Sequence, residues 1–213
     1  LQTDHVDIYI CHAWDPDAPL EETFRAMDDV VRQGKTRYIG VSNFNGWQVT
    51  ESLWTCDANN LDRFVVLQNQ YNLFNRWEIE SDVIPVCRRH GIGMMTFSPI
   101  AIGLLAGRYR RGQEPPADGP WGKGKYDLDR ALTEQNDAVI QKLIDIASSR
   151  GKTPSQVATT WVLDHPEITA AMIGPDSPEQ VDDSFGAVGW ELAAEEREAL
   201  DELSCSDTPY RYM

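Results

Sequence analysis

The sequence has 213 residues, 41% of them hydrophobic, and a formal net charge of −15. A chain of this length can bury a sizeable core within one domain. The acidic surplus repels phosphate backbones and anionic lipids, and no apolar run approaches the roughly 18 residues of a membrane span. These observations exclude nucleic-acid binding and membrane insertion as functions.

The four cysteines are scattered, with neither a CxxC pair nor a metal-ligand spacing. In a chain of this length such usage predicts reduced thiols, a cytoplasmic location and no metal site. The cysteines are Cys11, Cys56, Cys87 and Cys205.

Five runs of β-forming residues alternate with helical patterns along the chain. The first four recur at intervals of roughly 30 residues, about one β/α unit each. Strands separated by helices favour parallel pairing with right-handed crossovers. The predicted strands are Val6–Cys11, Arg37–Val41, Phe64–Leu67, Gly93–Phe97 and Ile168–Ile173. The predicted helices are Leu20–Val31, Trp47–Trp54, Glu78–Arg89, Thr133–Ser149 and Pro154–Leu163.

Residues that start or stop helices support these boundaries. Gly34 suits the end of the first helix, because glycine tolerates the left-handed backbone found there. Thr153 and Pro154 suit the first positions of the last of these helices. After the fifth strand, Ser177 suits the start of a further helix, and Gln180 would complete a capping box with it.

A Gly/Pro-rich stretch, Gly112–Lys125, lies in the longer interval before the fifth strand. It could be a flexible linker, but a loop of this length in a compact domain is more often functional. We therefore expect a functional loop over about residues 103–130.

Polar or conformationally special residues follow each predicted strand. In a (β/α)8 barrel the carboxyl ends of the strands form the active face, so these residues could share one site. They could instead be ordinary turn formers, but their recurrence after all five strands favours a shared site. The residues are His12, Ser42 with Asn43, Gln68, Phe97 with Ser98 and Pro99, and Gly174.

Two features could hold an anion. The helix start at Ser177 presents free N–H groups, and Gly174 lets a ligand approach the backbone closely. Arg108, Arg110 and Arg111 cluster in an otherwise acidic chain, where they could neutralise a phosphate or form a solvated basic loop.

Five stretches, in chain order, resemble the successive strand-end motifs of the aldo-keto reductase family: DIYICHAWDP, RYIGVSNF, LQNQYNLFNR, MMTFSPIAIGLLAGRY and MIGPDSPEQVDDSFGA. The similarity runs from about Val6 to Ala187, and the long loop resembles the branch of bacterial reductases and potassium-channel β subunits. The resemblance implies an α/β fold of the (β/α)8 TIM-barrel type, with strands four to eight present and the first three β/α units absent. We expect residues 1–213 to form one partial barrel domain with a tail at about 204–213.

The resemblance also implies a fold that binds NADPH or NADH across the strand ends and reduces aldehydes and ketones by hydride transfer. His12 matches the catalytic histidine that orients and polarises the substrate carbonyl, and Trp14 is a candidate substrate contact. The implied cofactor contacts, from nicotinamide to adenosine, are Ser42, Asn43, Gln68, Phe97, Ser98, Pro99, Ile100, Ala101, Gly103, Arg108, Gly174, Asp176, Gln180, Asp183 and Ser184.

The family's other catalytic residues, Asp, Tyr and Lys, lie upstream of the histidine strand and have no match in this sequence. We expect a fragment of a longer oxidoreductase, with little activity of its own. The alternatives are a separate N-terminal segment that complements the chain, or self-association of two copies along their open edges. The rival function is a non-catalytic nucleotide-binding protein that senses redox state or acts as a scaffold.

The resemblance favours NADP(H) over NAD(H), but Asp176 stands near a position where many NADPH-preferring members carry Arg or Lys. A carboxylate about 4 Å from the 2′-phosphate would cost roughly 1 kcal/mol per unit charge in water, so the choice stays open. The carbonyl substrate is not identified, and Trp14, Trp47 and Trp121 are candidate liners of its pocket. Trp47 and Trp54 could equally be packing residues.

Overall fold

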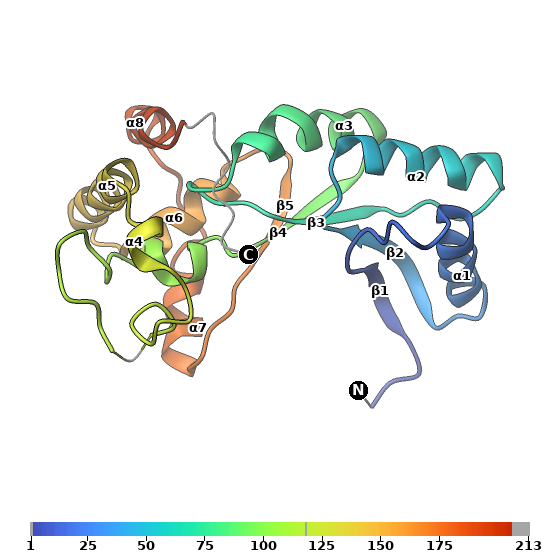
Figure 1. Cartoon of the computed structure of the whole chain (residues 1–213), viewed down its shortest axis with the longest axis horizontal. Coiled ribbons are helices and arrows are strands. Elements are labelled where there is room, and N and C mark those ends of the chain that lie inside the picture. Colours follow the sequence, from blue (N-terminus) through green and yellow to red (C-terminus); the bar gives the residue numbers. More distant parts are fainter. Residues whose placement is uncertain (1, 118, 206–213) are drawn as a thin grey trace. The chain divides into compact units, whose positions relative to one another are not determined.

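The computed structural model describes residues 2–117 and 119–205, which form five strands alternating with helices (Figure 1). The strands follow one another in a single sheet in chain order, and β2 pairs in parallel with both β1 and β3. The predicted α/β architecture is therefore confirmed. The strands are β1 (Val6–Cys11), β2 (Thr36–Ser42), β3 (Val66–Gln70), β4 (Gly93–Phe97) and β5 (Ile168–Met172).

The helices connect and extend these strands. The α-helices are α1 (Leu20–Arg32), α2 (Gly46–Ala58), α3 (Ile84–His90), α4 (Leu128–Ala131), α5 (Glu134–Arg150), α6 (Pro154–Leu163), α7 (Pro178–Phe185) and α8 (Ala194–Ser204). Two shorter elements complete the set: the π-helix η1 (Ile79–Val83) and the 3-10 helix η2 (Ala101–Ala106).

The chain divides into two compact units. The first unit comprises residues 1–69 and 78–95, and the second comprises residues 70–77 and 96–213. In the first unit, α1 packs on β2 and α2, with Phe24 stacked on Phe64 at a ring-centroid distance of 5.7 Å. Ile39, Val41 and Val49 are buried around this pair and complete its hydrophobic core.

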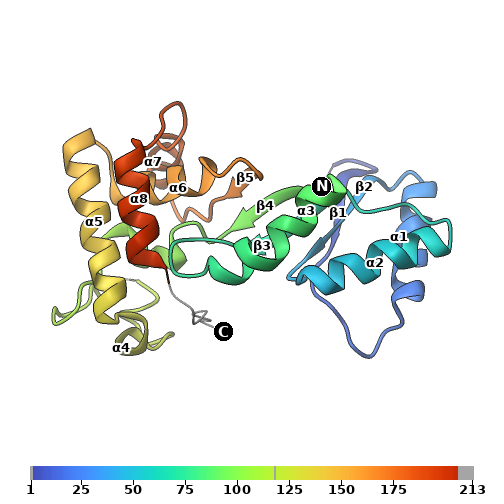
Figure 2. The same cartoon turned by 90° about the horizontal axis from the view of Figure 1, so that it is seen from above.

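The second unit has its own core, built largely from helices. Helix α5 packs on α6 and lies beside α8 (Figure 2), while α6 packs on β5 and η2. The largest fully buried side chain in the described part of the molecule is Trp161 on α6. Its ring lies 5.2 Å from that of Tyr71, which is also fully buried.

Most predicted boundaries agree with the structure to within two residues, but the third strand is displaced. It begins at Val66 and continues through the polar residues Gln68 to Gln70, beyond the predicted end at Leu67. The side chain of Asn69 is buried, and its Nδ2 donates to the carbonyl of Phe44 at 2.8 Å, which satisfies the donor end of the amide. The prediction was wrong because it ended the strand with its apolar run.

The predicted helix Glu78–Arg89 is interrupted. Its first part is the π-helix η1, and α3 begins at Ile84, whose N–H donates to the carbonyl of Ile79 five residues earlier. Pro85 follows directly, and proline has no N–H for an α-helical bond. The wider turn before it accommodates this missing donor.

The helix caps are confirmed with one correction. Thr153 and Gln156 form a reciprocal capping box at α6, and Gly34 has a φ of +69° just after α1. Ser177 caps α7 by accepting from the N–H of Gln180. The side chain of Gln180, however, accepts from the N–H of Asp176 at 2.8 Å, so the predicted box with Ser177 is only half formed.

Sequence patterns missed the short helix α4 and the last helix, α8. Helix α4 and η2 occupy parts of the segment predicted as a loop at about residues 103–130. The predicted tail at 204–213 falls from residue 206 onward outside the described residues.

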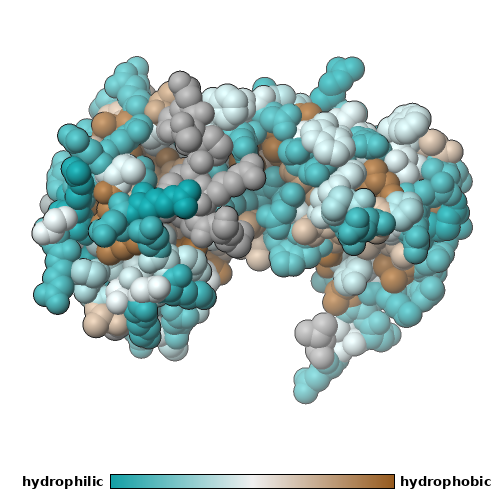
Figure 3. All heavy atoms as spheres, in the orientation of Figure 1, coloured by the Kyte–Doolittle hydropathy of each residue, from teal (hydrophilic) through white to brown (hydrophobic). Residues whose placement is uncertain are grey.

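Polar side chains cover much of the face seen in Figure 3, with apolar ones scattered between them. Trp54 is 69% exposed, so it does not belong to the core of its unit. Within residues 2–117 and 119–205, no helix has both the length and the apolar character needed to cross a bilayer.

Candidate active site and cofactor-binding residues

The carboxyl end of β1 presents His12, and the next strand fixes its backbone. His12 is exposed, and its carbonyl accepts a hydrogen bond of 2.9 Å from Nδ2 of Asn43, the residue that follows β2. Asn43 has a φ of +60°, a left-handed conformation that asparagine adopts more readily than most residues. One side-chain amide thus connects the ends of two neighbouring strands beside the imidazole.

Ser42 extends this connection to β3. Its hydroxyl is fully buried, donates to the carbonyl of Gln68 at 2.8 Å, and accepts from Nδ2 of Asn43 at 3.1 Å. The N–H of Asn43 also donates to the Gln68 carbonyl, at 3.1 Å. The structure therefore brings His12, Ser42, Asn43 and Gln68 together in the first unit, where hydrogen bonds link the ends of β1 and β2 to the middle of β3.

An aromatic group lies two residues after His12. The ring of Trp14 meets Phe44 edge-on at 5.4 Å and Trp47 at 5.1 Å. Phe44 is buried, whereas Trp47 is 56% exposed. The three rings form an aromatic corner close to His12 along the chain, suited to contact an apolar part of a ligand.

The turn after β4, which we call the β4 turn (Ser98–Gly103), has an unusual backbone. Ser98, Ala101, Ile102 and Gly103 all have φ between +52° and +87°. For residues with a side chain, this conformation costs about 1 to 3 kcal/mol each, and it persists only where the surroundings enforce it. Such strain is found in ligand-binding segments, and the role of this turn in cofactor binding stays a prediction.

Two side chains from elsewhere in the second unit hold the β4 turn. Asn72, which is fully buried, donates from Nδ2 to the carbonyl of Ser98 at 2.9 Å. Trp121, also buried, donates from Nε1 to the carbonyl of Ile102 at 2.9 Å. Trp121 was predicted as a pocket liner, and the structure gives it this buried contact in addition to a place beside the hollow in the long loop.

Sequence reasoning did not single out Asn72. The available signal was a single polar residue between Tyr71 and the apolar pair Leu73-Phe74. A buried asparagine in such a position must satisfy its amide with specific partners. The identity of those partners could not be read from the sequence.

The three arginines after the β4 turn differ in their surroundings. Arg110 donates from Nε and Nη2 to the two carboxylate oxygens of Asp137, at 2.8 and 3.0 Å. These bonds hold the pKa of Asp137 below its ordinary value, and the pairing raises the pKa of Arg110. Arg110 is therefore engaged in an ion pair within the second unit, whereas Arg108 is exposed on the surface.

An open hollow of about 650 Å³ lies beside Arg110, with Arg111, Trp121 and Tyr126 among its lining residues.

The start of α7 forms the last part of the predicted site. An open hollow of about 480 Å³ lies there, with Asp176 and Asp182 among its lining residues. A Cβ built on Gly174 would meet nothing within 4 Å, so its backbone is open to a ligand. Gln180 is exposed but holds the Asp176 N–H, and Ser184 donates to the Gln180 carbonyl at 2.7 Å.

Asp183 is engaged with the neighbouring helix. Its carboxylate accepts from Oγ1 of Thr153 at 3.1 Å and from Nε2 of Gln156 at 3.0 Å. It therefore joins α7 to the capped start of α6, and its predicted adenosine contact would have to compete with these bonds.

Three of the four thiols are poorly suited to act as nucleophiles, because burial disfavours their charged form. Burial raises the pKa of Cys56 and of Cys87 to about 12, and it raises the pKa of Cys11 as well. All four cysteines are free. A thiol with a raised pKa carries little thiolate at neutral pH and is a poor nucleophile.

The predicted site residues fall into two groups by unit. His12, Trp14, Ser42, Asn43 and Gln68 belong to the first unit. The second unit carries Phe97, Ser98, Pro99, Ile100, Ala101, Gly103, Arg108, Gly174, Asp176, Gln180, Asp183 and Ser184.

Comparisons with known proteins place this geometry in context. A model of the aldo/keto reductase family matches residues 1–204. A probable voltage-gated potassium channel subunit beta of Arabidopsis thaliana is 33% identical over 190 residues, 88% of this chain and 58% of that protein. An uncharacterized oxidoreductase of Bacillus subtilis is 33% identical over 204 residues, 95% of this chain and 60% of that protein.

A solved structure agrees with these relatives. The crystal structure of a thermostable aldo-keto reductase in complex with the inhibitor epalrestat matches with a TM-score of 0.72 and 29% identity. The match covers 94% of this chain and 61% of the other, and the chain spans three fifths or less of each of these curated relatives. The sheet of five strands is therefore part of the TIM-barrel fold, and the chain belongs to the aldo/keto reductase family.

Proposed function

We propose that the natural protein containing this chain is an NAD(P)H-dependent oxidoreductase that reduces aldehyde or ketone carbonyls, with His12 in the active site. The observation that carries the proposal is the hydrogen bond from Asn43 to the His12 carbonyl. It fixes the backbone of an exposed imidazole beside the end of β2, which is linked to the middle of β3. An imidazole on a fixed backbone can donate an N–H to a small polar group and orient it.

The residues of the first unit have distinct proposed roles. An N–H of His12 donates to the substrate carbonyl oxygen, which orients the carbonyl and draws electron density from its carbon. The bound reduced nicotinamide supplies the hydride. The aromatic corner of Trp14, Phe44 and Trp47 contacts the apolar part of the substrate and limits access of water.

The donor set of Asn43 fits a nicotinamide carboxamide. Its Nδ2 hydrogens go to the His12 carbonyl and the Ser42 hydroxyl, which leaves Oδ1 as an acceptor without a hydrogen-bond partner among the described residues. A carboxamide NH2 is the complementary donor. The Ser42 hydrogen is already donated to Gln68, so we propose that Ser42 holds the strand ends and can only accept from a ligand.

The second unit fits the remainder of the cofactor. A Cβ on Gly103 would meet nothing within 4 Å, so the β4 turn leaves its backbone accessible where a pyrophosphate is proposed to bind. Arg108 is exposed close by in the chain, and its charge complements phosphate. We propose NADP(H) ahead of NAD(H), with weak discrimination because Asp176 and Asp182 line the hollow at α7.

The proton that the reduced carbonyl oxygen needs comes, in this proposal, from a general acid outside the 213 residues. In this proposal the acid is the Tyr that the resemblance implies, and the implied Asp and Lys, also outside the 213 residues, would orient that acid and adjust its pKa. Without these three residues, the 213-residue chain should bind the cofactor weakly and turn over little substrate.

We propose a cytoplasmic location for the protein, in line with its free thiols.

The test is His12→Ala in the whole natural protein, assayed by loss of NADPH absorbance with a panel of small aldehydes and ketones. We expect kcat/KM to fall by about 10² to 10⁴, the range for loss of a positioned catalytic group. His90→Ala is the matched control, because His90 is exposed at the end of α3. An unchanged rate in the His12 variant would remove His12 from the mechanism.

A second candidate is a nucleotide-binding protein without turnover. Relatives of this chain include two proteins named as probable voltage-gated potassium channel β subunits. Saturable NADPH binding by the whole natural protein, with no turnover of any carbonyl in the panel, would favour this candidate over the enzyme.

A further inference from the structure

The β4 turn needs external support. Four of its six residues have left-handed backbone, and three of these, Ser98, Ala101 and Ile102, carry side chains that disfavour it. Its own backbone bonds are short-range, such as the Ala101 N–H to the Ser98 carbonyl at 2.9 Å. A turn of this kind keeps its shape only if neighbouring groups enforce it.

Asn72 provides support at the first residue of the turn. Its Nδ2 donates to the Ser98 carbonyl, while its Oδ1 accepts from the N–H groups of Phe74 at 2.9 Å and Asn75 at 3.1 Å. Both ends of the amide are therefore engaged, one by its own loop and one by the β4 turn. Because Asn72 is fully buried, losing either contact would leave a desolvated polar group.

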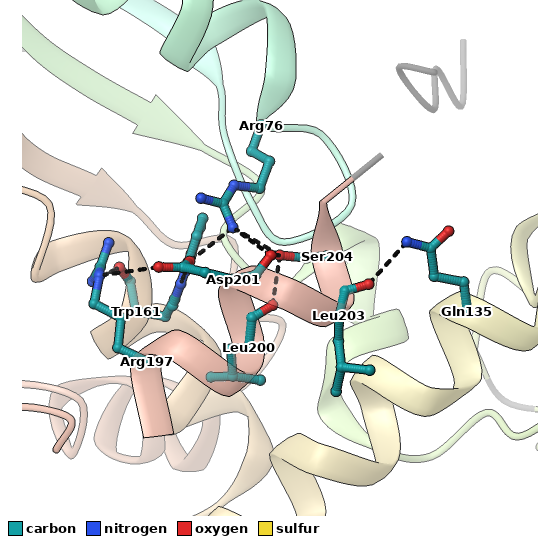
Figure 4. Close-up of polar contacts among 8 residues, drawn as sticks. All are labelled: Arg76, Gln135, Trp161, Arg197, Leu200, Asp201, Leu203 and Ser204. Carbon is teal, nitrogen blue, oxygen red and sulfur yellow. Dashed lines mark hydrogen bonds and ion pairs between the residues drawn. The ribbon is translucent and has the colours of Figure 1, made fainter. Parts of the chain in front are cut away.

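The loop that carries Asn72 is itself anchored to the last helix, α8. Arg76 donates hydrogen bonds from Nη1 to Oδ1 of Asp201 at 2.7 Å and to Oγ of Ser204 at 2.8 Å (Figure 4). The Arg76 side chain is only 14% exposed, so the ion pair is partly shielded from water. The loop from Gln70 to Trp77 is therefore fixed at Asn72 and again four residues later.

Trp161 strengthens this anchor. Its Nε1 donates to the same Asp201 oxygen at 2.9 Å, and the guanidinium carbons of Arg76 and Arg197 lie 4.8 and 5.4 Å from its ring centre. Cation–π contacts with a buried indole add to the charge pairing. Gln135 on α5 donates to the Leu203 carbonyl at 2.9 Å, which joins α8 to the helix beside it (Figure 4).

We infer that Asn72, anchored through Arg76 to α8, is the positioning residue that holds the β4 turn in its ligand-binding shape. The inference rests on the proposed function, in which this turn contacts the pyrophosphate of NADP(H). Asn72 touches neither substrate nor cofactor in this account. It acts through the Ser98 carbonyl, and α8 thereby contributes to cofactor affinity.

The test compares Asn72→Asp with the parent, in the whole natural protein, by fluorescence titration with NADPH and calorimetry with adenosine 2′,5′-bisphosphate. Aspartate keeps the acceptor for Phe74 and Asn75 but cannot donate to Ser98 when ionised. We expect NADPH to bind about tenfold more weakly, while the bisphosphate, which lacks the pyrophosphate bridge, binds as in the parent. Thr133→Ala is the matched control, because it removes a side-chain bond of similar kind, the cap that Thr133 forms with the Asn136 N–H at the start of α5. It should leave both affinities within twofold.

Each result decides between the two proposals. If the parent binds neither probe, the proposed cofactor function fails. If the parent binds both and Asn72→Asp keeps parental NADPH affinity, the positioning role fails and the proposed function stands. Equal weakening for both probes would also overturn the positioning role, since it would indicate a general loss of structure.

A second variant tests the anchor if Asn72→Asp does not fold. Asp201→Asn keeps the shape of the side chain but removes the charge that holds Arg76. We expect about threefold weaker NADPH binding, with the bisphosphate unaffected. Parental NADPH affinity in this variant would overturn the role of α8.

Discussion

The β4 turn and the start of α7 are both predicted to bind the cofactor, but they are held in different ways. The β4 turn is strained, and buried donors that are 26 and 19 residues away in the chain hold it at Ser98 and Ile102. The start of α7 is unstrained and exposed, and Ser177 and Gln180 stabilise it through bonds to residues three or four positions away. The first segment depends on the tertiary structure, whereas the second is encoded almost entirely in its own sequence.

This difference predicts that distant substitutions affect the β4 turn strongly. Trp121→Phe keeps an aromatic ring but is smaller and removes the donor to the part-buried Ile102 carbonyl. We expect the free energy of unfolding to fall by about 1 to 3 kcal/mol, through the lost hydrogen bond and the lost packing of a buried ring, with weaker NADPH binding. Chemical denaturation followed by circular dichroism measures the first effect.

Trp54→Phe is the control for this prediction, because Trp54 is 69% exposed and lies on α2. Its effect should stay within about 0.5 kcal/mol, as for most surface substitutions. If the two variants are equally stable, the bond from Trp121 does not support the β4 turn, and the contrast with α7 is lost.

At the start of α7, we expect a substitution to change cofactor preference through its charge, and not through the shape of the backbone. Asp176→Lys replaces a carboxylate in the hollow by an ammonium, and the local backbone bond to Gln180 does not involve the Asp176 side chain. We expect the ratio of NADPH to NADH affinity to rise about thirtyfold, since the change from −1 to +1 is two charges, each worth roughly 1 kcal/mol near 4 Å in water. Titration of both cofactors measures the ratio.

Glu51→Lys is the control for net charge, because it makes the same change on the exposed face of α2. It should leave the ratio unchanged. A parental ratio in Asp176→Lys would mean that the 2′-phosphate does not approach this residue.

The same contrast explains what the sequence could and could not predict. The caps at Thr153 and Ser177 were predictable because their partners lie three residues along the chain. The alternation of strands and helices was predictable from hydrophobic periodicity. The resemblance identified the motifs at the strand ends, and with them the family.

Long-range partners could not be predicted. The bonds from Asn72 and Trp121 to the β4 turn, and the pairing of Arg110 with Asp137, depend on which segments the fold places side by side. The continuation of β3 through polar residues depends in the same way on the buried contact of Asn69 with Phe44. In each case a side chain meets a distant group that no local pattern specifies.

The smallest expected effect tests the ion pair between Arg110 and Asp137, which follows the β4 turn in the chain. Because the bonds from Arg110 hold the pKa of Asp137 below its ordinary value of 3.8, the native state favours the ionised form. The pair therefore stabilises the fold above pH 3.8, and this stability is lost as the pH falls further, through the lowered pKa. The pair is partly exposed, so we expect Asp137→Asn to cost about 1 kcal/mol at pH 7.

Urea denaturation of parent and variant between pH 7 and pH 3 measures the difference directly. The gap should stay constant down to about pH 4 and then narrow, because the parent's Asp137 takes up a proton on unfolding. Glu51→Gln, an exposed carboxylate on α2, should show no gap at any pH. A gap for Asp137→Asn that persists unchanged at pH 3 would assign its stability to the hydrogen bonds that asparagine cannot reproduce, and not to the charge of the pair.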